Sequence, residues 1–224
     1  MHNPIILDCY TFDEEVYSNY PVQRINKRLP EWWVDLPKDF KIEDQNVPTM
    51  KSCAGLIDYF SSGFTIPLWT DIDFKIGETM TDGIECNISE VQVHPTQQRG
   101  NFLSHEKYQH LKLLTPWVIT CEEDIKFAFT FNTWSVDNPE EFVVPPGVID
   151  FLSQRSASIN MFLVYNGITR DVHLSSGFPI INMIPLSSRK LEIRNHLIDG
   201  ATWVEMNNSS AKLQKQKPKC PFGH

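Results

Sequence analysis

The stretch EDIKFAFTFNTW, residues 123–134, is the clearest indication of the fold class of this chain. Large apolar side chains recur in it at every second position: Ile125, Phe127, Phe129 and Phe131. Successive side chains of a β-strand point to opposite faces of the sheet, so these four lie on one face. So much apolar surface on one side of a strand predicts that this side faces a core.

The same alternation occurs on both sides of this stretch. It is present in TDIDFKIGE (70–78) and GIECNISEV (83–91), with a hairpin turn predicted at Asp82-Gly83. Further strands are predicted in LLTPWVITC (113–121), INMFLVYNG (159–167), ITRDVHLSS (168–176) and FPIINMIPL (178–186). Asn166-Gly167 predicts a second hairpin, between two of these strands. Short strands without regular intervening helices favour a mainly β fold, an antiparallel β-sandwich or a jelly-roll-like barrel.

One segment near the C-terminus fits two structures equally well. In RKLEIRNHLIDG (189–200), Leu191 and Ile193 alternate as in a strand, whereas Leu197 and Ile198 precede Gly200 as at the end of a helix. Residues 189–199 are therefore either a strand or a helix.

Short helices are expected before the strands. Thr11 followed by Glu14 fits a capping box, which predicts a helix that begins at Phe12. RINKRLPEWWVDLP (24–37) offers a helical turn with Pro30 in its first turn. CAGLIDYFSSGF (53–64) predicts a helix of about two turns that ends at Gly63.

These elements divide the chain into three parts. Residues 1–63 form a helical and irregular extension packed on the sheet, residues 64–205 form the β-sandwich, and residues 206–224 form a basic polar tail. The tail contains four lysines and no acidic residue, and its composition is typical of a solvated, flexible end. Because the whole chain has a formal charge of −8, the body without these four lysines carries −8 − 4 = −12.

Composition excludes several classes of protein. An acidic body argues against general nucleic-acid binding, which needs a basic surface. No apolar run reaches the roughly 18–20 residues of a membrane span, and the N-terminus lacks the basic residues of a signal peptide. The five cysteines are far apart and form no CxxC pair, which argues against a disulfide framework and a cysteine zinc site. We expect a soluble protein inside a cell, or in a particle assembled there.

No sequence motif names a reaction. The chain has no Walker loop, dinucleotide-binding glycine pattern, GxSxG or HExxH. A jelly-roll oxygenase holds iron with two histidines and one carboxylate, a set that His105, Glu106 and His173 are able to supply. Because His105 and Glu106 are adjacent, they point to opposite faces if they lie in a strand, which argues against this metal site.

Two pairs of polar residues are candidates for binding or proton transfer. Asp71 and Asp73 share one face of a predicted strand, where they form either a binding site or the solvated side of that strand. Asp171 and His173 share a face in the same way, as a base and its orienting partner do. Arg189, just after an apolar run, is a candidate contact for an anion.

Five motifs, in order, resemble uncharacterised proteins encoded by tailed phages of marine bacteria. They are LPEWWVDLP (29–37), CAGLIDYFSSGFTIPLW (53–69), PPGVIDF (145–151), GFPIINMIPL (177–186) and CPFGH (220–224). The resemblance spans nearly the whole chain and implies a viral origin, with a location in the host cytoplasm or the virion. It implies no site and no mechanism.

Two functions remain open. The first is a non-catalytic accessory or virion-associated protein that has no cofactor and binds a protein partner, a second copy or a small ligand. The alternative is a jelly-roll oxygenase that depends on iron. We favour the first, because binding requires no particular motif.

The adjacent tryptophans in LPEWWVDLP are the candidate recognition element. Neighbours on a helix point about 100° apart, so Trp32 and Trp33 cannot both enter one pocket. We expect Trp33 to pack inward and Trp32 to lie at a rim, where an amphipathic ring can meet a partner.

Overall fold

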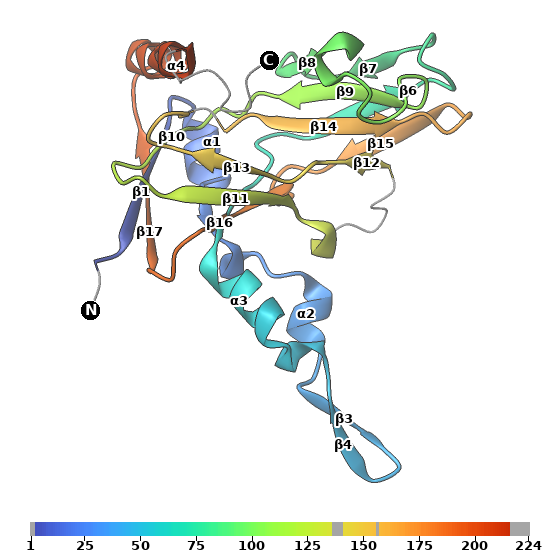
Figure 1. Ribbon diagram of the computed structural model, residues 1–224, viewed down its shortest axis with the longest axis vertical. Helices are drawn as coiled ribbons and strands as arrows, with labels where there is room; N and C mark the ends of the chain where they lie inside the picture. Colours follow the sequence, from blue (N-terminus) through green and yellow to red (C-terminus); the bar gives the residue numbers. More distant parts are fainter. Residues whose placement is uncertain (1–2, 136–140, 156, 216–224) are drawn as a thin grey trace.

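The fold is mainly β, as the alternating pattern predicts (Figure 1). The structure is a computed structural model that describes residues 3–135, 141–155 and 157–215, without the side chains of Thr96 and of residues 210–215. Four sheets surround the main core. They are β13-β11-β16-β5-β2 (Gly147–Asp150, Lys126–Phe131, Ile181–Pro185, Phe64–Ile66, Gln23–Arg24), β12-β14-β9-β8 (Phe142–Val143, Ile159–Val164, Tyr108–Leu113, Val91–Val93), β10-β1-β17 (Val118–Thr120, Ile5–Thr11, Leu191–Leu197) and β15-β6-β7 (Arg170–Leu174, Ile72–Ile76, Ile84–Cys86).

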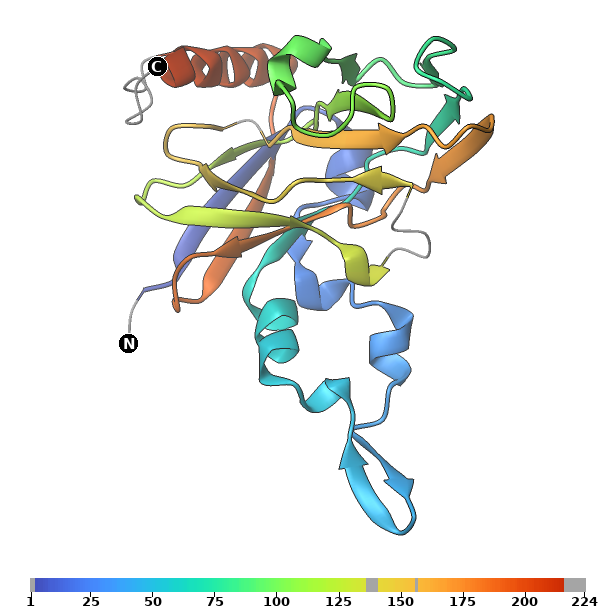
Figure 2. The same ribbon diagram turned by 45° about the vertical axis from the view of Figure 1, so that its right-hand side comes forward.

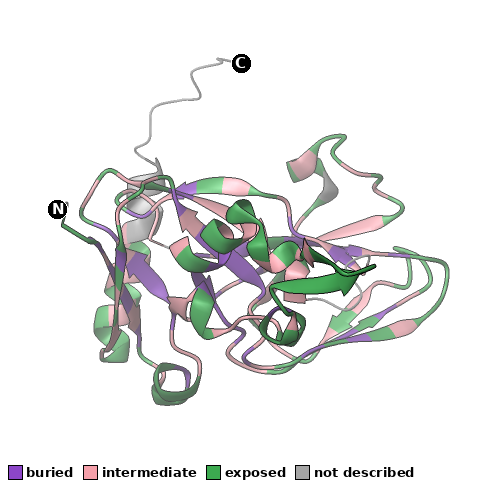
Figure 3. Cartoon of the chain, turned by 90° about the horizontal axis from the view of Figure 1, so that it is seen from below, coloured by how far each residue is buried: buried purple, intermediate pink, exposed green. Residues whose placement is uncertain are grey.

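The arrangement agrees with the predicted β-sandwich, although the sheets do not close into a barrel. Strand β11 supplies Phe127, which is fully buried and packs against Phe64 and Phe151 with ring centroids 5.8 and 5.2 Å away. Phe129 and Phe131 are partly buried against the same core. The buried residues, purple in Figure 3, lie mainly in the strands of the body. Among the described residues, no helix is both long and apolar enough to cross a membrane.

The first strand corrects the predicted extension over residues 1–63. Strand β1 lies between β10 and β17, and its residues Ile5, Leu7 and Cys9 are fully buried. Buried residues alternate with less buried ones along β1, because one face of the strand packs on the core. The N-terminal residues therefore belong to the body of the fold.

Helix α1 (Glu14–Asn19) begins later than the capping-box pattern predicts. Its N-cap is Asp13, whose carboxylate accepts the Val16 N–H at 3.0 Å. Thr11 is instead the buried last residue of β1. The capping box fails because a strand already occupies the position of its first residue.

Residues 189–199 form a strand over most of their length. Strand β17 runs parallel to β1 over seven residue pairs, from Ile5↔Leu191 to Thr11↔Leu197. Every other strand pair among the described residues is antiparallel. The long pairing with β1 outweighs the helix-like end of the segment.

The predicted hairpin turns have different outcomes. Gly83 has a φ of +75° between the paired strands β6 and β7, which confirms the first hairpin. Gly167 also has a positive φ, +82°, but β14 and β15 on either side of it belong to different sheets. The Asn166-Gly167 turn therefore carries the chain from one sheet to another, and the second hairpin prediction is wrong.

The C-terminal boundary predicted at residue 206 falls inside a helix. Helix α4 extends over Gly200–Lys215, and Trp203 anchors its first turns by donating its indole N–H to the Pro116 carbonyl at 3.1 Å. Residues 206–215 are therefore helical, and the rest of the predicted tail lies outside the described residues.

An arm projects from the body (Figures 1 and 2). It comprises η1 (Ile25–Lys27), α2 (Glu31–Asp35), the two-stranded ribbon of β3 (Asp39–Ile42) and β4 (Gln45–Pro48), η2 (Met50–Ser52) and α3 (Ala54–Ser62). The remaining short helices are η3 (Thr96–Arg99) and η4 (Thr133–Ser135). A small second core of Ile25, Trp33 and Phe60 holds the arm together.

Helix α3 ends at Gly63, as predicted, but not through a left-handed cap. The backbone of Gly63 is extended, with φ −108° and ψ −170°. A Cβ at this position would lie 2.5 Å from the backbone oxygen of Met183 in β16. Glycine is therefore needed here because the arm leaves the sheet in close contact with a strand.

Candidate functional site

The two adjacent tryptophans have different environments, as predicted. Trp33 is 6% exposed and packs against Phe60 of α3, with ring centroids 4.6 Å apart. Trp32 is 39% exposed. The inner tryptophan therefore belongs to the core of the arm, and the outer one is available to a ligand.

The Trp32 ring is held in place from two sides. Its indole N–H donates to the Trp134 carbonyl at 2.7 Å, across the junction between arm and body. Its ring lies edge-on to Trp33 at 5.7 Å and tilted against Trp134 at 5.9 Å. A half-exposed ring with this many contacts loses little further freedom when it binds a partner.

An open cleft of about 690 Å³ lies beside these rings. It is formed by the start of α2, by η2 and by η4, through Pro30, Glu31, Trp32, Met50, Thr133, Trp134 and Ser135. The lining combines apolar rings and a thioether with two hydroxyls and one carboxylate. Such a surface binds apolar groups and offers a single charged group, on Glu31, to a cation.

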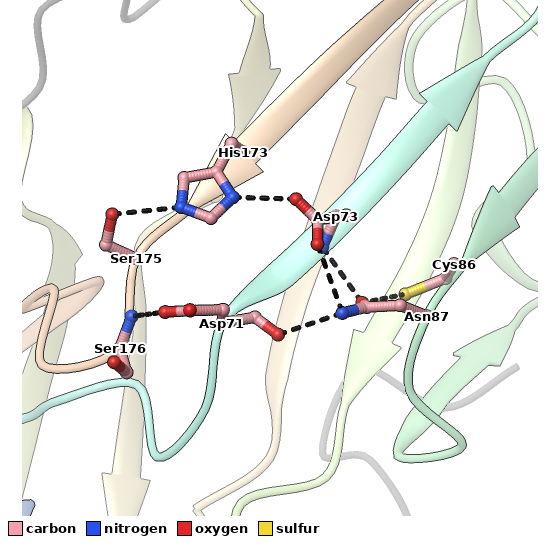
Figure 4. Close-up of polar contacts among 7 residues, drawn as sticks. All are labelled: Asp71, Asp73, Cys86, Asn87, His173, Ser175 and Ser176. Carbon is pink, nitrogen blue, oxygen red and sulfur yellow. Dashed lines mark hydrogen bonds and ion pairs between the residues drawn. The ribbon is translucent and has the colours of Figure 1, made fainter.

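A second polar cluster lies on the exposed face of β6 and β15 (Figure 4). His173 Nδ1 lies 2.6 Å from Asp73 Oδ1, and His173 Nε2 lies 3.1 Å from Ser175 Oγ. The backbone N–H of Ser176 donates to Asp71 Oδ1 at 2.7 Å. Asp71, Asp73 and His173, which the sequence pattern assigned to two separate candidate sites, are thus brought together.

Asn87 extends this cluster to a third strand segment. Its side-chain oxygen accepts the Asp73 N–H at 2.9 Å, and its amide nitrogen donates to the Asp71 carbonyl at 3.1 Å. Asp171, the candidate partner of His173, is instead opposite Lys75 in the strand register. The histidine binds across the sheet because Asp73 is its direct neighbour on β6.

Hydrogen bonds shift the pKa values of two of these groups. The hydrogen bond to Asp73 raises the pKa of His173 above its ordinary value. The backbone and side-chain hydrogen bonds from Ser176 lower the pKa of Asp71. Both shifts favour the charged forms, an imidazolium at His173 and a carboxylate at Asp71.

The order Asp73, His173, Ser175 is that of a serine nucleophile with its base, but the surroundings do not suit acyl transfer. That reaction requires free N–H donors for an oxyanion beside the nucleophile. The next three backbone N–H groups already donate hydrogen bonds within the protein. Ser176 donates to the Asp71 carboxylate, Gly177 to the Leu68 carbonyl and Phe178 to the Ser175 carbonyl. The Asp71 carboxylate would also repel an oxyanion. The cluster acts as a polar latch that fixes the turn after β15 to β6.

The residues proposed for iron do not form a site. His105 lies in a turn, where its Nε2 bonds to the Gly100 carbonyl at 2.6 Å, whereas His173 is bonded to Asp73 on another sheet. Across the described ranges, no three His, Cys, Asp or Glu side chains are grouped as a metal site requires, Glu106 included. His105 and His173 are therefore held by different partners, at two different sheets.

Arg189, the candidate contact for an anion, is bonded to groups of the protein itself. Its guanidinium binds the Glu123 carboxylate through both terminal nitrogens, with Nη2 2.9 Å from Oε1. It also donates to the carbonyls of Asn3 at 2.7 Å and Pro4 at 3.1 Å. Arg189 therefore joins the entry of β1 to the loop before β17, and its hydrogen bond lowers the pKa of Glu123.

The partners of Trp32 in the cleft were not predicted from the sequence. Trp134 is the last residue of the stretch EDIKFAFTFNTW, after the alternation of apolar side chains has ended. The end of this alternation was the one sign in the sequence that Trp134 lies at the surface. Met50 and Thr133 lie in short 3₁₀ turns that have no periodic pattern.

Compared with known proteins, the chain matches no family model, no curated protein and no solved structure.

Proposed function

We propose that this chain is a non-catalytic binding protein that takes an extended segment of a protein partner into the tryptophan cleft. The observation that carries the proposal is the half-exposed Trp32 ring, whose indole N–H is already bonded to the Trp134 carbonyl. The polar edge of this ring is satisfied internally, so its apolar surface remains for a partner. Aromatic rings fixed in this manner are typical anchors of binding surfaces.

The shape and chemistry of the cleft support a peptide as the ligand. Small-molecule sites enclose most of their ligand, whereas this cleft is open at the surface. Aromatic-lined grooves bind proline-rich and other extended apolar segments. Glu31, the one ionisable group in the lining, favours a segment with a lysine or arginine beside its apolar residues.

The resemblance to tailed-phage proteins supports an accessory role in the host cytoplasm or a place in the virion. Mass spectrometry of purified particles separates these locations. Detection at a constant ratio to the capsid protein supports the virion, and absence from the particle leaves the intracellular role.

A peptide selection tests the proposed ligand class. Random peptides displayed on a carrier are selected on the wild-type protein and counter-selected on Trp32→Ala. We expect extended apolar peptides with a basic residue, which change tryptophan fluorescence and lose at least about tenfold in affinity with Trp32→Ala or Trp134→Ala.

Trp203→Phe is the matched control, because Trp203 lies in α4 and contacts Phe12 and the Pro116 carbonyl, away from the cleft. Its affinity for the selected peptides should equal that of the wild type. Circular dichroism checks that each variant is folded. The proposal fails if no peptide depends on Trp32, or if Trp203→Phe weakens binding as much as Trp32→Ala does.

A further inference from the structure

The ribbon of β3 and β4 is the most exposed β-structure of the chain. All four residues of β3 are exposed, as are Gln45, Asn46 and Pro48 of β4. Figures 1 and 2 show the ribbon beyond α2 and α3, at the end of the arm far from the sheets of the body. Two-stranded ribbons are marginally stable alone in water, so a surface that adds strands to this one would stabilise it.

The register shows which backbone groups of the ribbon are free. Residue pairs in an antiparallel ladder alternate between pairs that exchange hydrogen bonds and pairs whose backbone groups point outward. The Thr49 N–H donates to the Lys38 carbonyl at 2.9 Å, and the register continues as Asp39↔Pro48, Phe40↔Val47 and Lys41↔Asn46. The backbone groups of Asp39 and Lys41 therefore point outward from β3.

The two edges of the ribbon are not equivalent. On β4, one of the two outward-pointing residues is Pro48, which has no N–H to donate. On β3, both outward-pointing residues, Asp39 and Lys41, retain an N–H and a carbonyl. Within the described part of the chain, β3 pairs with β4 alone, so its outer edge is open.

We propose that two copies of this chain associate through this edge of β3, antiparallel and centred on Phe40. The strand is self-complementary in that register. Asp39 of each copy then lies opposite Lys41 of the other copy, which gives two ion pairs related by the twofold axis. Phe40 of one copy lies opposite Phe40 of the other. The outward groups of Asp39 and Lys41 form four interchain hydrogen bonds.

The resulting sheet of four strands ends at Pro48 on both sides. No further copy can add in the same manner, so association stops at a dimer. One face of the sheet is apolar, since Phe40, Ile42 and Val47 share a face of the ribbon. Phe40 is 44% and Ile42 50% exposed in the single chain, and the dimer joins these side chains into one surface. This inference does not depend on the tryptophan cleft.

Charge reversal tests the register. Sedimentation equilibrium of the wild type over a wide concentration range should show a monomer and dimer in a micromolar to millimolar equilibrium. Asp39→Lys places two lysines opposite each other, and Lys41→Asp places two aspartates opposite each other. Each variant alone should dimerise at least about tenfold more weakly.

A mixture of the two variants supplies the matched control. In the mixed dimer, the lysine introduced at position 39 of one copy faces the aspartate introduced at position 41 of the other. The native Lys41 of the first copy faces the native Asp39 of the second, so both pairs are attractive again. We expect the equimolar mixture to recover dimerisation, and the double variant Asp39→Lys, Lys41→Asp to dimerise as the wild type does. Both results follow only if these residues are opposite each other.

A disulfide tests the centre of the register. In a background with Cys53 and Cys220 changed to serine, Phe40→Cys should form a disulfide-linked dimer under mild oxidation, since opposed residues of this pair type have Cα atoms about 4.5 Å apart. Ile42→Cys is the control. In this register residue 42 of one copy lies opposite residue 38 of the other, so the two introduced cysteines are too far apart to form a disulfide. A monomer at every concentration overturns the proposal, and so does a dimer that neither charge reversal weakens.

Discussion

At the residue scale, two glycines, Gly55 inside α3 and Gly63 just after it, have opposite roles. Gly55 has no atom within 4 Å of the position of an added Cβ, whereas at Gly63 this Cβ would lie 2.5 Å from the Met183 backbone oxygen. Gly63→Ala should destabilise the protein by about 1–3 kcal/mol, because a strand must move to relieve the contact. Gly55→Ala should be neutral or stabilising by up to about 1 kcal/mol. Urea denaturation measures both, and equal effects would contradict the close packing of α3 on β16.

His173 should make stability depend on pH. Because the pKa of His173 is raised in the folded state, its contribution is fully present below the unfolded value of about 6.5 and is lost as the pH rises through the folded pKa. The urea midpoint of the wild type should therefore fall over this range. In His173→Gln, the fall of the urea midpoint that is due to this histidine should be absent. In Asp73→Asn, this fall should be smaller than in the wild type. An identical pH profile for wild type and His173→Gln would show that the latch does not stabilise the fold.

The division of roles between Trp32 and Trp33 was predictable from residues alone, because neighbours on a helix point in different directions. The partners of these side chains were not. Trp32 bonds to a residue 102 positions away, and His173 to one 100 positions away. Only the order and register of the strands bring such residues together, and no local pattern encodes that order.

At the element scale, the turn of the ribbon is a strained site. Glu43 and Asp44 have φ values of +45° and +66°. This left-handed region costs a residue such as Glu43 about 1–2 kcal/mol, whereas glycine, asparagine and aspartate adopt it more readily. Glu43→Asn with Asp44→Gly should stabilise the ribbon by about 1 kcal/mol. Slower amide exchange at Thr49, which donates to the Lys38 carbonyl, measures the effect. Unchanged exchange would mean that the turn does not limit ribbon opening.

Strands with one buried face were predictable, whereas the exceptions have physical causes. Strand β6 alternates as predicted, with Ile72, Phe74 and Ile76 fully or almost fully buried. Strand β1 alternates as clearly, but its position before short helices favoured an irregular extension. The ribbon of β3 and β4 was missed because it buries no face, and a pattern of burial is what alternation detects.

At the scale of the whole molecule, the chain combines a large β core with a small arm core. Helix α3 ends against β16, and the Asn182 side chain of β16 donates to the Tyr59 hydroxyl of α3 at 2.8 Å. The tryptophan cleft lies where α2 meets η4, at the same junction between arm and body. Its geometry therefore depends on both cores, which explains why no single stretch of sequence contains it.

Binding of a partner segment in the tryptophan cleft is best tested by NMR, through the indole N–H signals of the six tryptophans. Titration with a selected peptide should shift the signal of Trp32, whose N–H bonds to the Trp134 carbonyl, and that of Trp134. The signals of the buried Trp117 and of the distant Trp203 should stay in place. Shifts confined to Trp203, or no shift of Trp32 at saturation, would contradict binding in this cleft.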